Sequence, residues 1–204
     1  MPKKFVFNPG PNEFSCTLQS HRCSAVSTST NKRCKKQVVI GQPFCWVHLQ
    51  QNQNLRIKQS NIPNAGLGLF AVRKNAPATA VIFHPHQKIT DYSGELINHA
   101  ELNKRYGDFT APYAIQVRHT VPYFYEDAAC KRGAGAIANH SNTNANAELI
   151  TTYDPHLRHD IALLEATTPI RNNEEILVDY GDEYLFDEDV AYSTKNDKKK
   201  KKNR

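Results

Sequence analysis

Four residues near the N-terminus have the side-chain types and the spacing of a zinc site. Ten residues separate Cys23 from Cys34, another ten separate Cys34 from Cys45, and His48 follows Cys45 after two. Three thiolates and one imidazole can hold Zn²⁺ in a closed tetrahedral site of the structural type. Metal binding would contribute folding energy that a polar segment of about thirty residues cannot gain from apolar burial. The alternative is a set of reduced thiols without a metal.

The remaining cysteines are weaker candidates for ligands. The chain has five cysteines and no secretory signal, a combination that argues against disulfides and for metal ligands or free thiols. Cys16 and His21 are reserve ligands for the zinc site. Cys130 has no partner nearby and is predicted to be a small buried side chain. His84 and His86, on either side of a proline, are more typical of an exposed turn than of a metal site.

A second group of residues suited to chemistry lies further along the chain. An Asn-His pair at 139–140 precedes an Asp-Tyr-Gly motif at 179–181, and a Gly-Leu-Gly turn at 66–68 stands upstream of both. A buried Asn-His pair needs hydrogen-bond partners in any fold, and glycines allow the backbone to approach a ligand closely. Taken alone, each motif also has a structural interpretation, as side chains that satisfy backbone groups or as a tight turn.

Tyrosines are numerous in the same region. Their rings can wall a channel and attract a cation, and their hydroxyls can orient a polar group. The alternative is that they are ordinary core or strand residues. The candidates are Tyr92, Tyr113, Tyr123, Tyr125, Tyr180 and Tyr184.

In their order along the chain, these motifs resemble those of the SET-domain protein lysine methyltransferases. The order runs from the glycine turn through a Tyr-x-Gly-Glu strand at 92–95 and small residues at 133–136 to the Asn-His and Asp-Tyr-Gly motifs. The resemblance extends from about Leu55 to Phe186. It implies a mainly β fold with short helices, a SET-type β-clip of small sheets with a pseudoknot. It also implies methyl transfer from S-adenosylmethionine to a lysine amine.

The resemblance assigns roles to individual residues. It implies that Tyr180 is the catalytic tyrosine. The residues implied to bind S-adenosylmethionine are Gly66, Leu67, Gly68, Tyr113, Asn139 and His140. Those implied to line the substrate channel are Tyr92, Tyr125, Val178 and Tyr184. A lysine ammonium, with a pKa of about 10.4, must lose its proton before it attacks, and a narrow apolar channel disfavours the charged form.

Two departures from the family pattern affect the channel. Residues 142–146 (Asn-Thr-Asn-Ala-Asn) stand where many relatives have Cys-x-Pro-Asn, and no cysteine follows Tyr180. The zinc-bound segment that closes the channel in those relatives is therefore missing, and residues 184–186 (Tyr-Leu-Phe) are expected to close it instead. Val178 stands where many relatives carry a larger aromatic residue that limits methylation, so the number of methyl groups added stays open.

The expected zinc-binding region, residues 16–50, is called the cysteine segment below. Its pattern resembles the plant WRC zinc module, Cys-x9-Cys-x10-Cys-x2-His, with one extra residue in the first gap. The basic residues placed as in that module are Arg22, Lys32, Arg33, Lys35 and Lys36. A lysine run at 195–204 adds to the formal net charge of +6 and is predicted to be disordered. Such runs act as nuclear localisation signals or bind nucleic-acid phosphates, the alternative being a tail that only aids solubility.

The elements that must position these residues follow from the apolar pattern and the resemblance. Strands are predicted at 80–83, 113–117, 147–153 and 161–166, and a helix at 98–106. A hydrophobic share of 39% in 204 residues suits one domain of ordinary size with a small module. The expected regions are an N-terminal segment (1–15), a zinc-binding module (16–50), a SET methyltransferase domain (54–186) and a disordered basic tail (187–204), with a polar linker at 50–54.

Two classes of function fit these observations. The first is an active lysine methyltransferase that acts on histone tails, with the zinc module and basic tail in contact with DNA or nucleosomes. The second is a chromatin- or nucleic-acid-binding adaptor with an inactive SET domain. No apolar stretch approaches eighteen residues and the N-terminus lacks a signal-peptide core. A soluble nuclear protein without a membrane partner is therefore expected.

Overall fold

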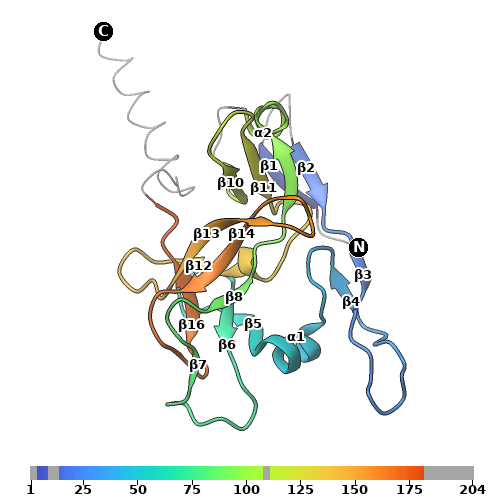
Figure 1. The fold of residues 1–204 in the computed structure, drawn as a ribbon, viewed down its shortest axis with the longest axis vertical. Coiled ribbons are helices and arrows are strands. Elements are labelled where there is room, and N and C mark those ends of the chain that lie inside the picture. The colour runs from blue at the N-terminus through green and yellow to red at the C-terminus, as the bar shows by residue number, and fades with distance from the viewer. Residues whose placement is uncertain (1–3, 9–13, 108–110, 182–204) are drawn as a thin grey trace.

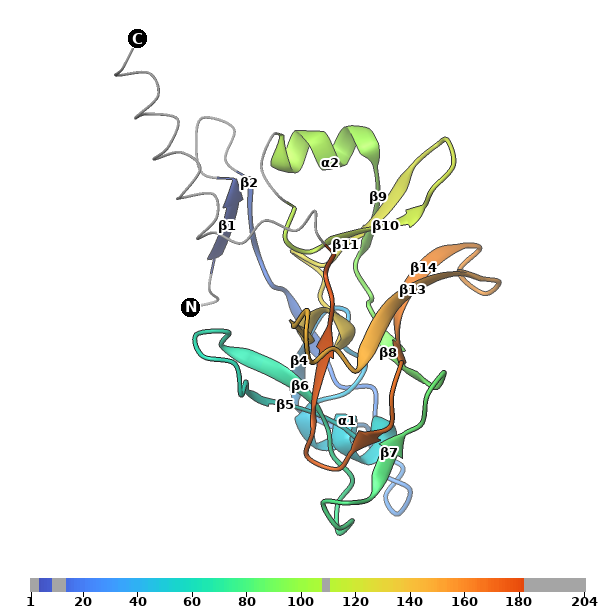
Figure 2. The same ribbon diagram turned by 90° about the vertical axis from the view of Figure 1, so that its left-hand side faces the viewer.

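The structure is a computed structural model, and it describes residues 4–8, 14–107 and 111–181. The predictions for residues 184–186 and for the basic tail fall outside this range. Figures 1 and 2 show the sheet of β9, β10 and β11 with helix α2 at one end of the molecule and helix α1 at the other. The helices in this part of the chain are too short or too polar to cross a membrane.

Short strands dominate the described residues, as the sequence predicts, and they form five sheets (Figure 1). The largest sheet contains β5 (Leu55–Gln59), β6 (Leu67–Ala71), β8 (Lys88–Asp91), β12 (Asn139–His140), β13 (Ala147–Asp154), β14 (His159–Ala166) and β16 (Glu175–Val178). A second sheet contains β9 (Glu95–Asn98), β10 (Ala114–Arg118) and β11 (Phe124–Asp127). Three strand pairs are β1 (Lys4–Asn8) with β2 (Phe14–Thr17), β3 (Ser20–Arg22) with β4 (Gln37–Val39), and β7 (Val81–Phe83) with β15 (Ile170–Arg171). The helical elements are α1 (Trp46–Gln53), α2 (His99–Tyr106) and a 3-10 turn at Gly135–Ile137.

Strand β16 brings the two C-terminal motifs together. It pairs antiparallel with β6 and parallel with both β13 and β12, so it lies among strands that precede it in sequence. In this register Asn139 faces Leu177 and His140 faces Val178. The Asn-His pair and the Asp-Tyr-Gly motif therefore become neighbours. Insertion of the last strand among earlier ones is also what the expected pseudoknot requires.

Strand β14 forms the centre of the core. Residues 161–164 are all buried, a continuous apolar run typical of a strand covered on both faces. Leu164 belongs to one apolar cluster with Ile176, and Ala162 belongs to a second with Tyr92 and Val117. The strand therefore joins the two parts of the core between which the site described below is built.

Helix α2 forms where the sequence predicts it. Asn98 Oδ1 accepts a hydrogen bond from Glu101 N at 2.9 Å, which satisfies one of the free N–H groups of the first turn. Glu101 Oε1 accepts from Arg105 Nε at 3.1 Å one turn later. Tyr106 ends the helix and is buried. The predicted helix at 98–106 is confirmed.

Helix α1 replaces the polar linker expected at 50–54. It begins after Cys45 and ends at Gln53. The next residue, Asn54, caps the helix in a left-handed conformation with φ of 54°. Leu49 is buried and belongs to the main core, and the helix packs against β5. Leu49 is the one buried residue of the helix, and its last four residues are polar, so it lacks the sustained apolar periodicity from which a helix is predicted. The cysteine segment therefore continues into the larger domain without a linker.

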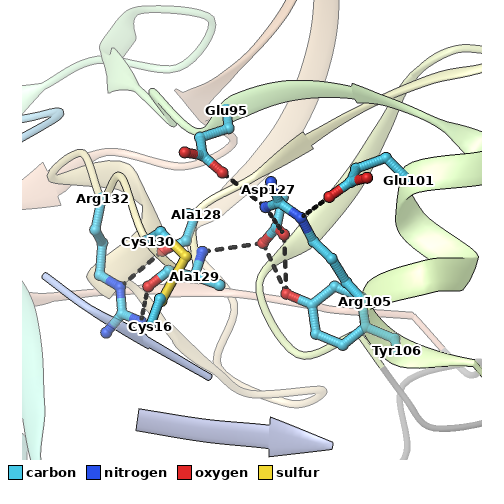
Figure 3. Close-up of a disulfide and its surroundings, with 10 residues drawn as sticks. All are labelled: Cys16, Glu95, Glu101, Arg105, Tyr106, Asp127, Ala128, Ala129, Cys130 and Arg132. Carbon is cyan, nitrogen blue, oxygen red and sulfur yellow. Dashed lines mark hydrogen bonds and ion pairs between the residues drawn. A yellow bond between two sulfur atoms is a disulfide. The ribbon is translucent and has the colours of Figure 1, made fainter. Parts of the chain in front are cut away.

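Cys16 and Cys130 form a disulfide, which corrects the expectation of metal ligands or free thiols (Figure 3). The bond joins β2 to the segment after β11 across a sequence separation of 114 residues. The spacing of the cysteines gave no sign of this pair, because Cys16 lies in β2 and Cys130 lies in the turn after β11, far away in the sequence. His21, the other reserve ligand, instead places Nε2 at 2.9 Å from Gln42 O.

Removing this disulfide is expected to destabilise the protein. The double change Cys16→Ala and Cys130→Ala should lower the free energy of unfolding by about 2–4 kcal/mol, because a crosslink across a long loop restricts the unfolded chain. Urea unfolding of the oxidised proteins measures the difference, with Ser15→Ala in the same strand as the control. A difference below about 0.5 kcal/mol, the range of ordinary surface changes, would contradict a stabilising role.

A buried ion-pair network lies beside the disulfide (Figure 3). Asp127 is fully buried and accepts hydrogen bonds from Tyr106 Oη at 2.9 Å, Arg105 Nη1 at 2.8 Å and Ala129 N at 2.9 Å. Arg105 Nη1 also donates to Glu95 at 2.7 Å. Burial raises the pKa of Tyr106, and the adjacent Asp127 carboxylate adds to the effect, so the phenol stays a neutral donor. The segment after Asp127 is thus held by the network at its start and by the disulfide a few residues later.

Candidate functional site

The four residues predicted to bind zinc come together in a Cys3His cluster. The three sulfur atoms and one imidazole nitrogen lie within 4.8 Å of one another. His48 Nδ1 is 3.5 Å from Cys23 Sγ and 3.3 Å from Cys45 Sγ, and Cys34 Sγ is 4.0 Å from Cys45 Sγ. A tetrahedral zinc ion with bonds of about 2.0–2.3 Å holds its ligand atoms roughly 3.3–3.8 Å apart. The cluster is confirmed, and its set of donor atoms is compatible with one zinc ion.

Two arginines of the basic set tie the cysteine segment together. Arg22 Nη2 donates to Arg33 O at 2.7 Å, and Arg33 Nη2 donates to Arg22 O at 2.6 Å. Arg22 Nε also donates to Cys34 O at 2.8 Å, and Arg33 Nε donates to Cys23 O at 2.8 Å. These guanidinium groups therefore bridge the segments that carry the first two zinc-ligand candidates.

A cleft of about 1040 Å³ borders the glycine turn and β12. Its volume is at the upper end of the range for small-molecule sites, roughly 300–1,000 Å³. The residues predicted to bind the cofactor that line it are Gly66, Leu67, Tyr113, Asn139 and His140. Another part of its wall comes from the N-terminal region through Leu18, Val39 and Gln42. The cleft therefore lies between the two parts of the chain.

The two glycines of the turn are required for different reasons. Gly66 has φ of +72°, a conformation that residues with a Cβ rarely adopt. A Cβ at Gly68 would collide with the Glu175 carboxylate and lie 3.0 Å from Asn139 Nδ2. In the described part of the chain, Gly68 does not border the cleft. The close approach that this glycine permits is therefore to Glu175, whereas the sequence suggested an approach to a cofactor.

Glu175 orients Asn139. It is buried, and its carboxylate accepts hydrogen bonds from Ser60 Oγ at 2.7 Å, Asn61 N at 2.7 Å and Asn139 Nδ2 at 3.1 Å. Asn139 Nδ2 also donates to Leu67 O at 3.1 Å. Both hydrogens of this amide are engaged, so Oδ1 is the acceptor end of the side chain. An amide oxygen held in this way suits an ammonium donor.

His140 holds the backbone of the Asp-Tyr-Gly motif. Its Nδ1 accepts a hydrogen bond from Tyr180 N at 3.0 Å, so the proton of the neutral ring is on Nε2. Asp179 Oδ1 lies 3.7 Å from the same Nδ1, too far for a hydrogen bond to compete. The rings of His140 and Tyr180 are 5.3 Å apart between centroids. Tyr180 is thus fixed through both its main chain and its ring.

A narrow channel of about 90 Å³ meets the cleft. The residues that border both cavities are Pro112, Tyr113, Ala136, Ala138 and Tyr180. The rest of the channel wall is largely apolar and consists of Tyr92, Ala111, Ala114, Ile115, Gly135, Leu149 and Val178. A channel with such walls disfavours a charged group inside it.

The tyrosine hydroxyls at the channel have defined partners. Tyr180 Oη donates to Ala138 O at 2.6 Å, and Tyr92 Oη donates to Tyr113 O at 2.9 Å. Burial raises the pKa of Tyr92 well above its usual value, and the neighbouring Tyr180 and Asp127 add to the effect. Tyr92 therefore remains a neutral donor. Tyr180 and Ala138 place a polar pair on an otherwise apolar wall.

The predicted channel residues do not all meet. Tyr92 and Val178 line the channel. Tyr125 Oη instead lies 3.1 Å from His99 Nδ1 and, within the described residues, borders neither cavity. Tyr184 falls outside the described range. Sequence reasoning missed the role of Glu175, because two consecutive acidic residues at the start of an apolar strand are a weak signal for a buried carboxylate.

The family model described as SET domain matches residues 66–181. No curated protein matches the chain significantly. A crystal structure of the Chaetomium thermophilum polycomb repressive complex 2 is similar, with a TM-score of 0.52 and 24% identity over 76% of this chain and 17% of that chain.

Two related structures give the same result. The complex in an autoinhibited conformation bound to S-adenosylmethionine has a TM-score of 0.52 and 20% identity, over 81% of this chain and 19% of that chain. A humanized mutant of the Chaetomium thermophilum complex bound to an inhibitor has a TM-score of 0.51 and 23% identity, over 65% and 15%. At these identities the likeness shows the fold, and this chain spans less than a fifth of each matched chain.

The region matched by the family model contains most of the site. It runs from Gly66 through the Asn-His pair to Gly181 and makes up more than half of the 204 residues. The β12–β16 pairing within it joins the two C-terminal motifs. The chain belongs to the SET domain family.

Proposed function

We propose that this chain is an S-adenosylmethionine-dependent protein lysine N-methyltransferase. The observation that carries the proposal is the junction of the two cavities, where the cleft and the apolar channel share Tyr113, Ala138 and Tyr180. A methyl donor in the cleft and a lysine side chain in the channel would meet at this junction. A similar structure is bound to S-adenosylmethionine, which supports the choice of cofactor.

Groups along the cleft suit the amino-acid end of that cofactor. Asn139 Oδ1 is positioned as an acceptor because Glu175 and Leu67 engage the amide hydrogens. Gly66, with its positive φ, lines the same wall of the cleft, and its carbonyl accepts a hydrogen bond from Ser60 N at 2.9 Å. When bound, S-adenosylmethionine supplies a methyl group on a sulfonium centre. The work of the protein is to hold the cofactor and to align the amine with it.

The channel suits a neutral amine. Its apolar walls disfavour the lysine ammonium and exclude water, so the substrate enters the reactive position after losing a proton. The hydroxyl of Tyr180 and the carbonyl of Ala138 would orient the amine at the inner end. Tyr92 contributes indirectly, because its hydroxyl fixes the main chain of Tyr113.

We propose histone tails as the substrate and the nucleus as the location. The family resemblance and the similarity to polycomb complexes support this proposal. Contact with DNA or nucleosomes through the cysteine segment would fall mainly to Lys32 and Lys35. Arg22 and Arg33 are engaged with main-chain carbonyls, and Lys36 Nζ lies 4.3 Å from the centroid of the Trp46 ring.

The test of the proposed function is incubation of the protein with labelled S-adenosylmethionine and a panel of core histones. Incorporation of label into a lysine is the expected result. An adaptor with an inactive SET domain, the alternative function, would bind DNA or nucleosomes without transferring label.

Replacing Asn139 with Ala is expected to weaken S-adenosylmethionine binding about tenfold or more, because a hydrogen bond to a charged group contributes about 1.5–3 kcal/mol. Calorimetric titration measures the affinity. Asn144→Ala is the matched control, since Asn144 is exposed and bonds only to nearby Ser141 and Thr143 among the contacts described. Unchanged affinity in Asn139→Ala, or no binding by the unaltered chain, would contradict the assignment.

A further inference from the structure

Arg132 lines the cleft close to its junction with the channel. Its guanidinium carbon lies 3.8 Å from the centroid of the Tyr113 ring. Its Nε donates to Ala128 O at 3.0 Å and its Nη2 donates to Ala129 O at 3.4 Å. Figure 3 shows Arg132 turned back toward these two carbonyls beside the Cys16–Cys130 bond. A planar fork that is held by two acceptors has a fixed orientation, so it offers the Tyr113 ring a fixed surface.

The same segment also holds the main chain of Tyr113. Ala128 N donates to Tyr113 O at 2.8 Å, and Tyr92 Oη donates to the same oxygen at 2.9 Å. Arg132 in turn binds the carbonyl of Ala128. The segment from Ala128 to Arg132 therefore supports Tyr113 twice, at its carbonyl and at its ring.

The main chain of Arg132 is docked on the N-terminal region. Arg132 N donates to Ile40 O at 2.7 Å. Gly41 has φ of +103°, and a Cβ there would lie 2.6–2.9 Å from the main-chain atoms of Arg132. The next residue, Gln42, is buried and lines the cleft. Cys130, two residues before Arg132, is bonded to Cys16.

We propose that Arg132 is a positioning residue for the methyl-transfer site, which holds Tyr113 between the cleft and the channel and joins it to the turn at Ile40 and Gly41. The cysteine segment would then help to position the methyl-transfer site, in addition to its proposed contact with nucleosomes. This inference rests on the proposed function, because it assigns Tyr113 to the site of methyl transfer. Part of the alignment of the reaction would then depend on the segment between β11 and the 3-10 turn, which reaches the cleft through Arg132.

A double-mutant cycle tests the link between Arg132 and Tyr113. Arg132→Met should lower kcat/KM for the best histone substrate about tenfold to a hundredfold, the scale of a small misplacement of reacting groups. In a Tyr113→Leu background, where the ring is already lost, the same change should have an effect of less than about threefold. Equal effects in the two backgrounds would show that Arg132 does not act through Tyr113 and would overturn the proposal.

Two further variants complete this experiment. Arg132→Lys should recover little of the loss, because an ammonium group cannot lie flat on the ring while it binds two carbonyls. Arg118→Met is the matched control, since Arg118 is a half-buried arginine on β10 that borders neither described cavity. Activity of Arg118→Met should stay within about twofold of the unaltered chain, as expected for a site that shares no partner with Tyr113.

The docking of the N-terminal region is tested from the other side of the contact. Gly41→Ala should lower kcat/KM about tenfold or more because the added Cβ displaces the Arg132 main chain, with the metal content unchanged. Gly107→Ala is the control: Gly107 also has a positive φ, +58°, but its nearest neighbour to an added Cβ is 3.9 Å away. Full activity in a folded, metal-loaded Gly41→Ala protein would refute the coupling.

A readout without turnover separates this proposal from the proposed function. Hydrogen exchange of the Ala128 amide reports its bond to Tyr113 O. Arg132→Met and Gly41→Ala should each speed this exchange at least about tenfold, since local opening becomes easier when the support is lost. Unchanged exchange would refute the positioning role even in an active enzyme. Faster exchange in a chain that binds no cofactor would uphold the positioning role and refute the proposed function.

Discussion

Replacing Tyr180 with Phe is expected to lower methyl-transfer turnover by about 10²–10³, while the affinity for S-adenosylmethionine stays within a few-fold of the original value. The lost hydroxyl is proposed to orient the neutral amine and to stabilise the methyl group during transfer. Such contacts are stronger in the transition state than in the bound ground state, so their loss appears in kcat more than in binding. Single-turnover kinetics together with calorimetric titration would measure the two effects separately.

The geometry makes this substitution informative. Tyr180 N is bonded to His140 Nδ1 at 3.0 Å, and the two rings lie 5.3 Å apart. Neither contact needs the hydroxyl, so a phenylalanine should keep the ring in place. The hydroxyl itself donates to Ala138 O at 2.6 Å. Its removal therefore changes the polar end of the channel and leaves the aromatic wall standing.

Tyr153→Phe is the control for Tyr180→Phe, because Tyr153 is exposed and lies on β13 away from both cavities. Near-original activity in Tyr180→Phe would mean that this tyrosine has been assigned wrongly. Tyr113 and Tyr92 would then be the next residues to change. The hydroxyl of Tyr92 is bonded to Tyr113 O, so an effect of Tyr92→Phe would be expected to arise through the position of Tyr113.

The local parts of the fold could be predicted from sequence because their causes are local. Asn98 caps α2 through a residue three positions later, and the apolar run of β14 is buried on both faces. The Asn-His pair and Tyr180 could be identified as site candidates from short sequence motifs. In the structure, the β12–β16 pairing brings these motifs together. The Cys3His spacing was likewise sufficient to identify its cluster.

The parts that sequence did not reveal depend on contacts between distant segments. The Cys16–Cys130 bond spans 114 residues, and Glu175 reaches back to Ser60 and Asn61. Leu49 is the one buried residue of helix α1, whose last four residues are polar, so the sequence shows no sustained apolar period. Tyr125 was assigned to the channel because it is a tyrosine in the matched region, but strand direction places it beside His99. Residue type alone therefore identified candidate site residues, and the pairing of the strands determined which of them lie at the site.

Removal of zinc is expected to have the largest effect on stability. We propose that the cluster holds one zinc ion per chain, and structural zinc sites in small peptides contribute about 10–16 kcal/mol of apparent binding energy, which is folding energy. Metal analysis of the purified protein should give one zinc per chain. A chelator should unfold the cysteine segment, since only Cys23, Cys45 and Ala25 form its buried apolar cluster within the described residues.

The ligand assignment is tested by Cys34→Ser, which removes one thiolate that lies 4.0 Å from Cys45 Sγ. Zinc should be lost or bound much more weakly, because a hydroxyl is a poor substitute for a thiolate at a tetrahedral site. His21→Ala is the matched control, since His21 was the reserve ligand and instead contacts Gln42 O. Its zinc content should stay at one per chain. Full metal retention in Cys34→Ser, with loss in His21→Ala, would mean that a different set of residues binds the metal.

Loss of the metal should also lower the unfolding temperature of the larger domain, because α1 follows Cys45 directly and Leu49 packs in the main core.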